Sequence, residues 1–236
     1  ATSLNSLGYL FLRMGNYAKA EPLLKRALEI SEEQLGPDHP STATSLNNLA
    51  LLYRSMGQYA KAEPLLKRAL EIREQELGPD HPKTATSLNN LAGLYKSMGN
   101  YAEAEPLLER ALEIHEEQLG PNHPSTATSL NNLALLHATL GNESEALPLF
   151  RQAYRGIREQ AEQIFSFTTE RERLAYIDQI NPYGGFAVID STPDLARAIL
   201  QFKGSVLDSV VEDRERVAHS DKPKVNDLHQ KGLTLQ

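Results

Sequence analysis

Cysteine is absent from this chain of 236 residues, and so is any long apolar run. The first absence excludes disulfide bonds, thiolate metal ligands and a cysteine nucleophile within these residues. The second excludes a membrane-spanning helix, which needs roughly 18 or more predominantly apolar residues. No signal peptide is visible either. A net charge of -7 and a pI of about 5.5 argue against a general nucleic-acid or anionic-membrane surface.

The dominant feature that is present is an internal repeat. Residues 43–84 return as residues 85–126 with 10 mismatches over 42 positions, so 32 positions match. Residues 1–42 carry the same pattern, and a fourth copy opens at residue 127 and diverges after Leu140. A fixed period of this length indicates a stacked array in which each unit buries its apolar face against its neighbours.

Each unit is predicted to be a helix hairpin. The first helix of unit 43–84 places four apolar residues on one face: Leu46, Leu49, Ala50 and Tyr53. Gly57 then ends that helix, because glycine readily takes a positive φ. A second amphipathic helix follows and ends at Gly78-Pro79. In Asp80-His81-Pro82, either Asp or His can cap the next helix, and proline suits its first turn.

These residues carry a family resemblance. The spacing of Leu46, Leu49, Ala50, Tyr53, Gly57, Tyr59 and Ala62 resembles the tetratricopeptide repeat. The LNNLA phrase and the GPDHP linker make a unit of 42 residues, which is similar to kinesin light chain repeats and their bacterial relatives. The resemblance covers about residues 1–160 and implies an all-α fold, a right-handed α-solenoid of antiparallel helix hairpins followed by additional helices. The fourth copy departs from the pattern: His137 replaces the tyrosine, and its second helix is predicted to run from Glu143 to about Phe165.

The predicted domain organisation has three parts. The repeat array spans residues 1–167 (units 1–42, 43–84, 85–126 and 127–167), a helical extension spans 168–218, and a flexible tail spans 219–236. Residues 196–209 resemble the segment that follows the repeats in bacterial CHAT (caspase-like) proteins, which implies a peptidase domain downstream of Gln236. Because the pattern is cut at both ends, we expect a piece of a longer intracellular, cytoplasmic protein.

The best candidates for a binding site are polar residues of the first helices. Helical spacing places them opposite the packing residues, in two rows made almost entirely of asparagines: Asn5, Asn47, Asn89, Asn131, and Ser6, Asn48, Asn90, Asn132. An amide offers donors and an acceptor, so such rows can hold the backbone of an extended peptide. Arg13, Arg54 and Lys96 follow on the same helices and favour an acidic ligand. The alternative is that near-identical repeats copy an ordinary solvated face that binds nothing.

No catalytic, metal or cofactor site is predicted. His39, His81 and His123 recur once per unit, but equivalent residues of stacked helices lie at least about 8–10 Å apart and cannot share an ion. We therefore expect these histidines to start helices. No Gly-rich phosphate loop, nucleophile elbow or HExxH helix is present.

The function predicted from these features is a non-catalytic protein–protein interaction scaffold. The array would bind a peptide or protein segment in its concave groove, and neither nucleic acid nor a membrane is an expected partner. Two alternatives stay open. One is a sensor or regulatory arm of a CHAT peptidase, and the other is a structural module that self-associates through the ends of the array.

Overall fold

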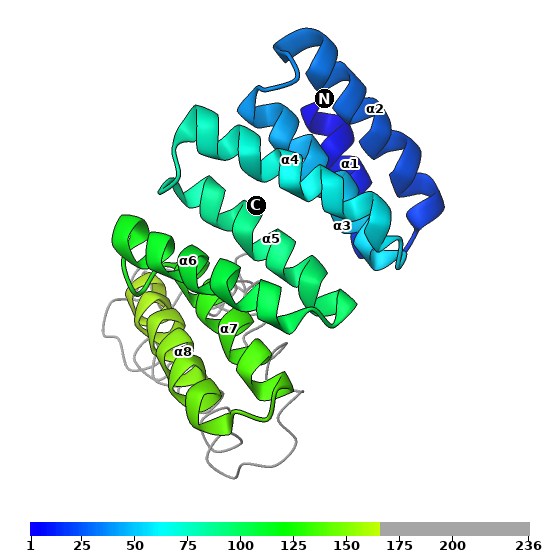
Figure 1. Ribbon diagram of the computed structural model, residues 1–236. Coiled ribbons are helices and arrows are strands. Elements are labelled where there is room, and N and C mark those ends of the chain that lie inside the picture. The colour runs from blue at the N-terminus through cyan, green and yellow to red at the C-terminus, as the bar shows by residue number, and fades with distance from the viewer. Residues whose placement is uncertain (166–236) are drawn as a thin grey trace, which may run out of the picture. The chain divides into compact units, whose positions relative to one another are not determined.

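The computed structural model describes residues 1–165, which form eight α-helices and no strand (Figure 1). Their side chains are described as far as Ile157, and again for Glu159. The helices pair in chain order: α1 (Thr2–Arg13) with α2 (Tyr17–Leu35), α3 (Pro40–Ser55) with α4 (Tyr59–Leu77), α5 (Pro82–Met98) with α6 (Tyr101–Leu119), and α7 (Pro124–Thr139) with α8 (Glu143–Phe165). The all-α prediction is confirmed. The predicted extension (168–218) and tail (219–236) lie outside the described residues.

The linker between units, GPDHP twice and GPNHP before α7, starts each new helix through its histidine. Nδ1 of His39, His81 and His123 accepts a hydrogen bond from the backbone N–H two residues later, at 3.0, 3.0 and 3.1 Å. The proline that follows each histidine occupies the first helical position, where its missing N–H costs nothing. Of the two capping residues that the sequence allowed, the structure therefore selects histidine, and the expected helix-start role is confirmed.

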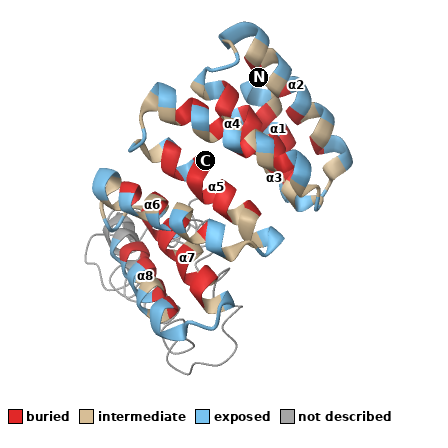
Figure 2. Ribbon diagram, in the orientation of Figure 1, coloured by how far each residue is buried: buried red, intermediate tan, exposed pale blue. Residues whose placement is uncertain are grey.

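Packing joins each hairpin to the next. Besides the contact within each pair, α3 contacts α2 and α1, α5 contacts α4 and α3, and α7 contacts α6 and α5. Leucines such as Leu46, Leu66 and Leu88 are fully buried. Alanines such as Ala50 and Ala62 are fully buried too. Figure 2 shows buried residues as red bands along the helices. Because each unit shares its core with its neighbours, the array extends by repetition rather than by enlarging one core.

The second helix of the fourth unit has the bounds that the sequence predicted, Glu143 to Phe165. It joins the array through Phe150, which is buried, and through a bond from Gln152 to Glu116 at 2.8 Å. No described helix is long and apolar enough to cross a bilayer.

The same contacts recur wherever consecutive units meet. We call these contact surfaces junction 1 (units 1–42 and 43–84), junction 2 (units 43–84 and 85–126) and junction 3 (units 85–126 and 127–167). On the second helices, Arg68 pairs with Glu32 and Arg110 with Glu74, both at 2.7 Å. These pairs are partly exposed, so each contributes about 1 kcal/mol or less. Their regular spacing indicates that they set the register between units.

Candidate functional site

The first row of asparagines lies inside the junctions. The Nδ2 groups of Asn5, Asn47 and Asn89 donate to Ser45, Ser87 and Ser129 of the following unit at 2.7, 3.3 and 2.7 Å. These three asparagines are 8%, 4% and 9% exposed. Their amides therefore bridge consecutive first helices.

The second row is built on the first. The Nδ2 groups of Asn48, Asn90 and Asn132 donate to the Oδ1 atoms of Asn5, Asn47 and Asn89 at 3.3, 3.1 and 3.1 Å. The second-row side chains are half-buried, and one hydrogen bond fixes each amide plane. The carbonyl oxygen and the second N–H of each amide take part in no hydrogen bond given by the described residues. The two rows therefore form one continuous ladder with a row of oriented amides at its outer edge.

The expectation that both rows face solvent is wrong for Asn5, Asn47 and Asn89. At roughly 100° per residue, Asn47 lies only about 100° from Leu46 around the helix, whereas Asn48 lies about 200° away. A first helix packs not only on its own second helix but also on the first helices before and after it. Its buried arc is therefore wider than a single apolar stripe, and it includes the first row. Asn131, the last member of that row, is half-buried.

The solvent-accessible strip along the first helices is consequently narrow. In unit 43–84 it consists of Thr44 and Ser55, which are exposed, and Asn48 and Leu51, which are half-buried. We call these four residues and their equivalents in the other units the first-helix face.

A hollow of about 300 Å³ interrupts the first-helix face in unit 85–126. Gly93 stands there in place of the leucine found at Leu51 and Leu135. The guanidinium of Arg54 lies over this glycine, since a Cβ at Gly93 would come within 2.5 Å of Nη1. Besides Gly93 and Arg54, the lining includes Asn89, Lys96, Ser97, Leu108 and Asn132. The missing side chain therefore creates a recess whose walls carry two cations.

Neither cation has an acidic partner within the part of the chain that the structure describes. The Lys96 ammonium donates to the backbone oxygen of Asn132 at 3.3 Å. Burial lowers the pKa of Arg54. Burial and, after it, the charge of Arg54 lower the pKa of Lys96. Both shifts mean that a nearby negative charge would stabilise the charged forms.

Arg13 does not belong with this pair. It is exposed near the end of α1, and its equivalents one and two units later are Ser55 and Ser97. Arg54 and Lys96 are instead equivalent to Leu12. The three basic residues predicted to share one face therefore do not form a row.

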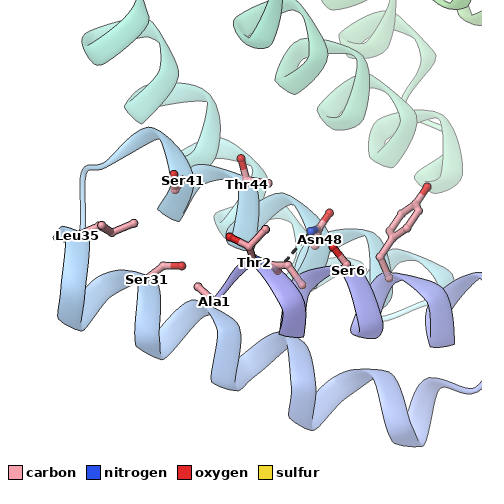
Figure 3. Close-up of a pocket in the computed structure, with 10 residues that line it drawn as sticks. Ala1, Thr2, Ser6, Ser31, Leu35, Ser41, Thr44 and Asn48 are labelled. Atoms are coloured by element: carbon pink, nitrogen blue, oxygen red, sulfur yellow. Dashed lines mark hydrogen bonds between the residues drawn. The ribbon is translucent and has the colours of Figure 1, made fainter.

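A second cleft, of about 430 Å³, opens at junction 1 (Figure 3). Thr2, Ser6, Ser31, Ser41 and Thr44 are among its lining residues, together with Asn48 of the second row. Neither cleft was predicted. The signals were nonetheless visible as differences between repeats: Leu51 against Gly93, and Ser31 against Arg73 and His115.

No group of three or more His, Asp or Glu side chains within the described residues is arranged to hold a metal. The recurring histidines are each engaged at their own helix start. The site as a whole offers hydrogen bonds and charge along an elongated face.

Helix hairpins stacked in chain order and tied by a hydrogen-bonded ladder define the chain as an α-solenoid of helical repeats. A family model described as "Tetratricopeptide repeat" matches residues 1–75, 52–117 and 84–159. These matches cover more than half of the chain, which therefore belongs to the tetratricopeptide repeat family.

Solved structures are similar along most of the chain. One is a kinesin light chain candidate from Podosopora anserina with nearly identical TPR-like repeats, at 26% identity and a TM-score of 0.58, covering 93% of this chain and 97% of that one. A second is BtubC (BKLC) from P. vanneervenii, at 22% identity and a TM-score of 0.60, covering 92% of this chain and 80% of that one. A third is a Rap protein in complex with the competence and sporulation factor, at 16% identity and a TM-score of 0.61, covering 95% of this chain and 64% of that one. The second and third share the fold alone.

The resemblance to kinesin light chain-type repeats is confirmed by the Podosopora anserina structure. No curated protein matches the chain. The resemblance of residues 196–209 to CHAT proteins falls outside the described residues and stays a prediction.

Proposed function

We propose that the repeat array is a non-catalytic interaction module that binds an extended peptide or protein segment along the first-helix face. The observation that carries this proposal is the second row of Asn48, Asn90 and Asn132. Each amide is held in place by a first-row asparagine, yet it keeps an acceptor and a donor for another molecule. A preorganised row loses little side-chain entropy on binding, which favours affinity. A cytoplasmic location accompanies this proposal as a prediction.

The ligand is proposed to be acidic. Arg54 and Lys96 border the hollow at Gly93 without an acidic partner among the described residues. A carboxylate placed between them would form charge-assisted hydrogen bonds, which are roughly twice as strong as neutral ones. The hollow, of about 300 Å³, has room for such a group beside the Arg54 guanidinium that lies over Gly93.

Similar proteins support the class of function. The Rap protein, which shares the fold, was solved in complex with the competence and sporulation factor, and this supports an interaction role for the array. The partner of that protein implies nothing about the ligand of this chain.

The test starts with peptides selected from a random display library on the wild-type protein. Their dissociation constants are then measured against the triple variant Asn48→Ala, Asn90→Ala, Asn132→Ala, and against Gly93→Leu. We expect the triple variant to bind at least about tenfold more weakly, because each lost hydrogen bond is worth about 1 kcal/mol. Gly93→Leu should selectively weaken acidic peptides, because the leucine fills the hollow and displaces only the flexible end of Arg54.

Lys67→Gln is the matched control, because Lys67 lies exposed on the second helix α4 and pairs with Glu63 of the same helix. It should leave every dissociation constant unchanged. Equal affinity of the wild type and the triple variant would refute the first-helix face as the site. Selected peptides without an excess of Asp or Glu would refute the acidic preference alone.

Self-association through the array end is a second candidate, favoured by one observation. Leu7 and Leu10 of α1 are 42% and 53% exposed, whereas their equivalents Leu49 and Leu52 are buried against the preceding unit. This apolar surface would suit another repeat. Sedimentation over a wide concentration range tests it, and a strict monomer at the highest concentration would argue against it.

A further inference from the structure

One position of the second helix changes its side chain from junction to junction. It holds Ser31 at junction 1, Arg73 at junction 2 and His115 at junction 3. In all three cases the side chain is buried and forms a hydrogen bond with a serine. This serine, Ser45, Ser87 or Ser129, also accepts a hydrogen bond from an asparagine of the first row. Equivalent spaces at the three junctions are therefore occupied by three different side chains.

At junction 2 the space is filled by a guanidinium. Arg73 Nη1 donates to the backbone oxygen of Lys83 at 2.8 Å and to Ser87 Oγ at 2.9 Å, and Nη2 donates to Thr44 Oγ1 at 3.4 Å. No acidic side chain pairs with Arg73 among the described residues. Burial lowers its pKa to about 10, so Arg73 is still charged at pH 7. Neutral oxygen acceptors therefore hold the two terminal nitrogens of a charged guanidinium in this space, while Nε is buried without a partner among the described residues.

At junction 3 an imidazole takes the same place. His115 Nδ1 lies 2.8 Å from Ser129 Oγ, and Nε2 lies 3.2 Å from the backbone oxygen of Pro82. A second planar nitrogen group thus fits the space that Arg73 occupies one unit earlier.

At junction 1 the side chain is too short to fill the space. Ser31 Oγ donates back to the Ala27 oxygen at 2.9 Å and lies 3.0 Å from Ser45 Oγ. The cleft of about 430 Å³ opens beyond it, with Ser31 and Leu35 on one side and residues of α1 and α3 on the other (Figure 3). Shifting the partners of Arg73 back by one unit of 42 residues gives the Ser41 oxygen, Ser45 Oγ and Thr2 Oγ1. Two of these residues, Ser41 and Thr2, line the cleft.

We propose that the cleft at junction 1 binds an arginine side chain of a ligand, whose guanidinium takes the place that Arg73 fills at junction 2. The lining supplies hydroxyl and carbonyl acceptors and includes no lysine or arginine. The Thr44 hydroxyl donates to the Pro40 oxygen at 3.3 Å and accepts from Arg73 Nη2 at 3.4 Å, so one lone pair remains available to a further donor. A guanidinium has five N–H donors and suits such a set better than an ammonium or a carboxylate.

The cleft is continuous with the first-helix face through Asn48 and Ser6, which line it. The proposal therefore rests on the proposed function in one respect: the arginine is expected to belong to the same bound peptide. The bound peptide would then have an arginine in the cleft next to α1 and an acidic group near Gly93.

The direct test uses a small probe, Nα-acetyl-arginine methylamide, titrated into the isotope-labelled protein by NMR. We expect saturable shifts of the backbone amides of Thr2, Ser31, Ser41 and Thr44, and no such shifts with the corresponding capped glutamate. In Ser31→Arg the protein's own guanidinium fills the cleft, so probe affinity should fall at least about tenfold. Ala1 lines the cleft as well, so protein acetylated at its N-terminus serves as a control without that charge.

The reverse variant provides a second test in case Ser31→Arg does not fold. Arg73→Ser empties junction 2 and should create a second probe site, reported by the backbone amides of position 73, Lys83 and Thr86, none of which lines the cleft at junction 1. Absence of saturable shifts in the wild type would overturn the proposal, as would equal affinity of wild type and a folded Ser31→Arg. An Arg73→Ser protein that is folded but gains no site would also count against it.

The double variant Asn90→Ala, Asn132→Ala separates this inference from the proposed function. It alters the first-helix face and leaves the lining of the cleft intact. Probe binding that survives in this variant, together with lost peptide binding, supports both proposals. Peptide binding without probe binding would leave the first-helix face standing and refute the arginine cleft.

Discussion

Asn47 and Asn48 are adjacent in the sequence but differ in how much of each amide the fold uses. Asn47 donates to Ala43 and Ser87 and accepts from Asn90, at 2.9, 3.3 and 3.1 Å. Asn48 makes a single bond, to Asn5 at 3.3 Å, and is half-buried. The first residue therefore stabilises the array, and the second remains available for binding.

We predict that Asn47→Ala lowers the free energy of unfolding by about 1–3 kcal/mol, because it removes a buried hydrogen-bonding group and leaves its partners unsatisfied. Asn48→Ala should cost about 1 kcal/mol or less, because water can replace its bond. Urea unfolding of both variants measures the difference, and each serves as the control of the other because both place alanine in the same helix. Equal losses would contradict the assignment of the first row to the junctions.

The separation of the two asparagine rows could not be predicted from periodicity. Helical spacing located the second row on an open face, but it assumed one buried stripe per helix. Asn47 is buried by the next unit, a contact between residues about one repeat apart that no pattern inside a single helix reveals. The hollow at Gly93 could not be predicted for a similar reason. A glycine in a helix indicates a binding site only once the structure places Arg54 and Lys96 around it.

His115 makes junction 3 sensitive to pH. Burial lowers its pKa, the bond to the Pro82 oxygen opposes this shift, and the charge of His123 adds to it. A histidine whose pKa is lower in the folded state binds more protons when unfolded. Its stabilising contribution is therefore complete above the ordinary histidine pKa of about 6.5 and is lost as pH falls through the lowered folded value.

We predict that the urea midpoint of the wild type falls more steeply between pH 7.5 and pH 5 than that of His115→Arg. The arginine stays charged throughout and has an internal precedent in Arg73. The other histidines and the carboxylates are common to both proteins, so the difference between the two curves isolates His115. Parallel curves would show that His115 does not couple folding to protonation.

At the scale of the helix, the sequence was sufficient to predict where helices start and end and which apolar residues they bury. Helix starts, helix ends and the buried apolar positions Leu46, Leu49 and Tyr53 all depend on contacts within a few residues or on one repeating face. Gly57 and Gly99 end helices with φ of 71° and 80°, which a side chain would strain. Local chemistry decides these features, and the repetition of each signal removes the ambiguity of a single copy.

We predict that His81→Ala destabilises the array by about 1 kcal/mol, the typical cost of losing an N-cap. The variant removes the acceptor of the Lys83 N–H, a bond of 3.0 Å. His81→Asn should retain most of the stability, because asparagine is among the best N-cap residues. Thermal unfolding compares the three proteins, and an unchanged midpoint for His81→Ala would show that the linker starts α5 without help from its histidine.

At the scale of the molecule, stability is expected to follow position along the array. An internal unit packs against a neighbour on each side, and α3 accordingly buries Leu52 completely. The equivalent Leu10 of α1 is 53% exposed, and α1 packs mainly against α2 and α3. In an array of nearest-neighbour contacts, a unit with one interface opens at a lower free energy than a unit with two.

We therefore predict faster amide hydrogen exchange in α1 than in α3 and α5. The α1 sequence differs from that of α3 at six of the twelve aligned positions (residues 2–13 against 44–55), so protection factors corrected for intrinsic exchange rates are compared. Exchange measured by mass spectrometry should show α1 losing protection first, and Leu10→Ala should cost far less than Leu52→Ala, for which about 2–5 kcal/mol is expected. If α1 instead proved as protected as α3, its apolar face would have to be covered in solution, and self-association through that end would become the preferred explanation.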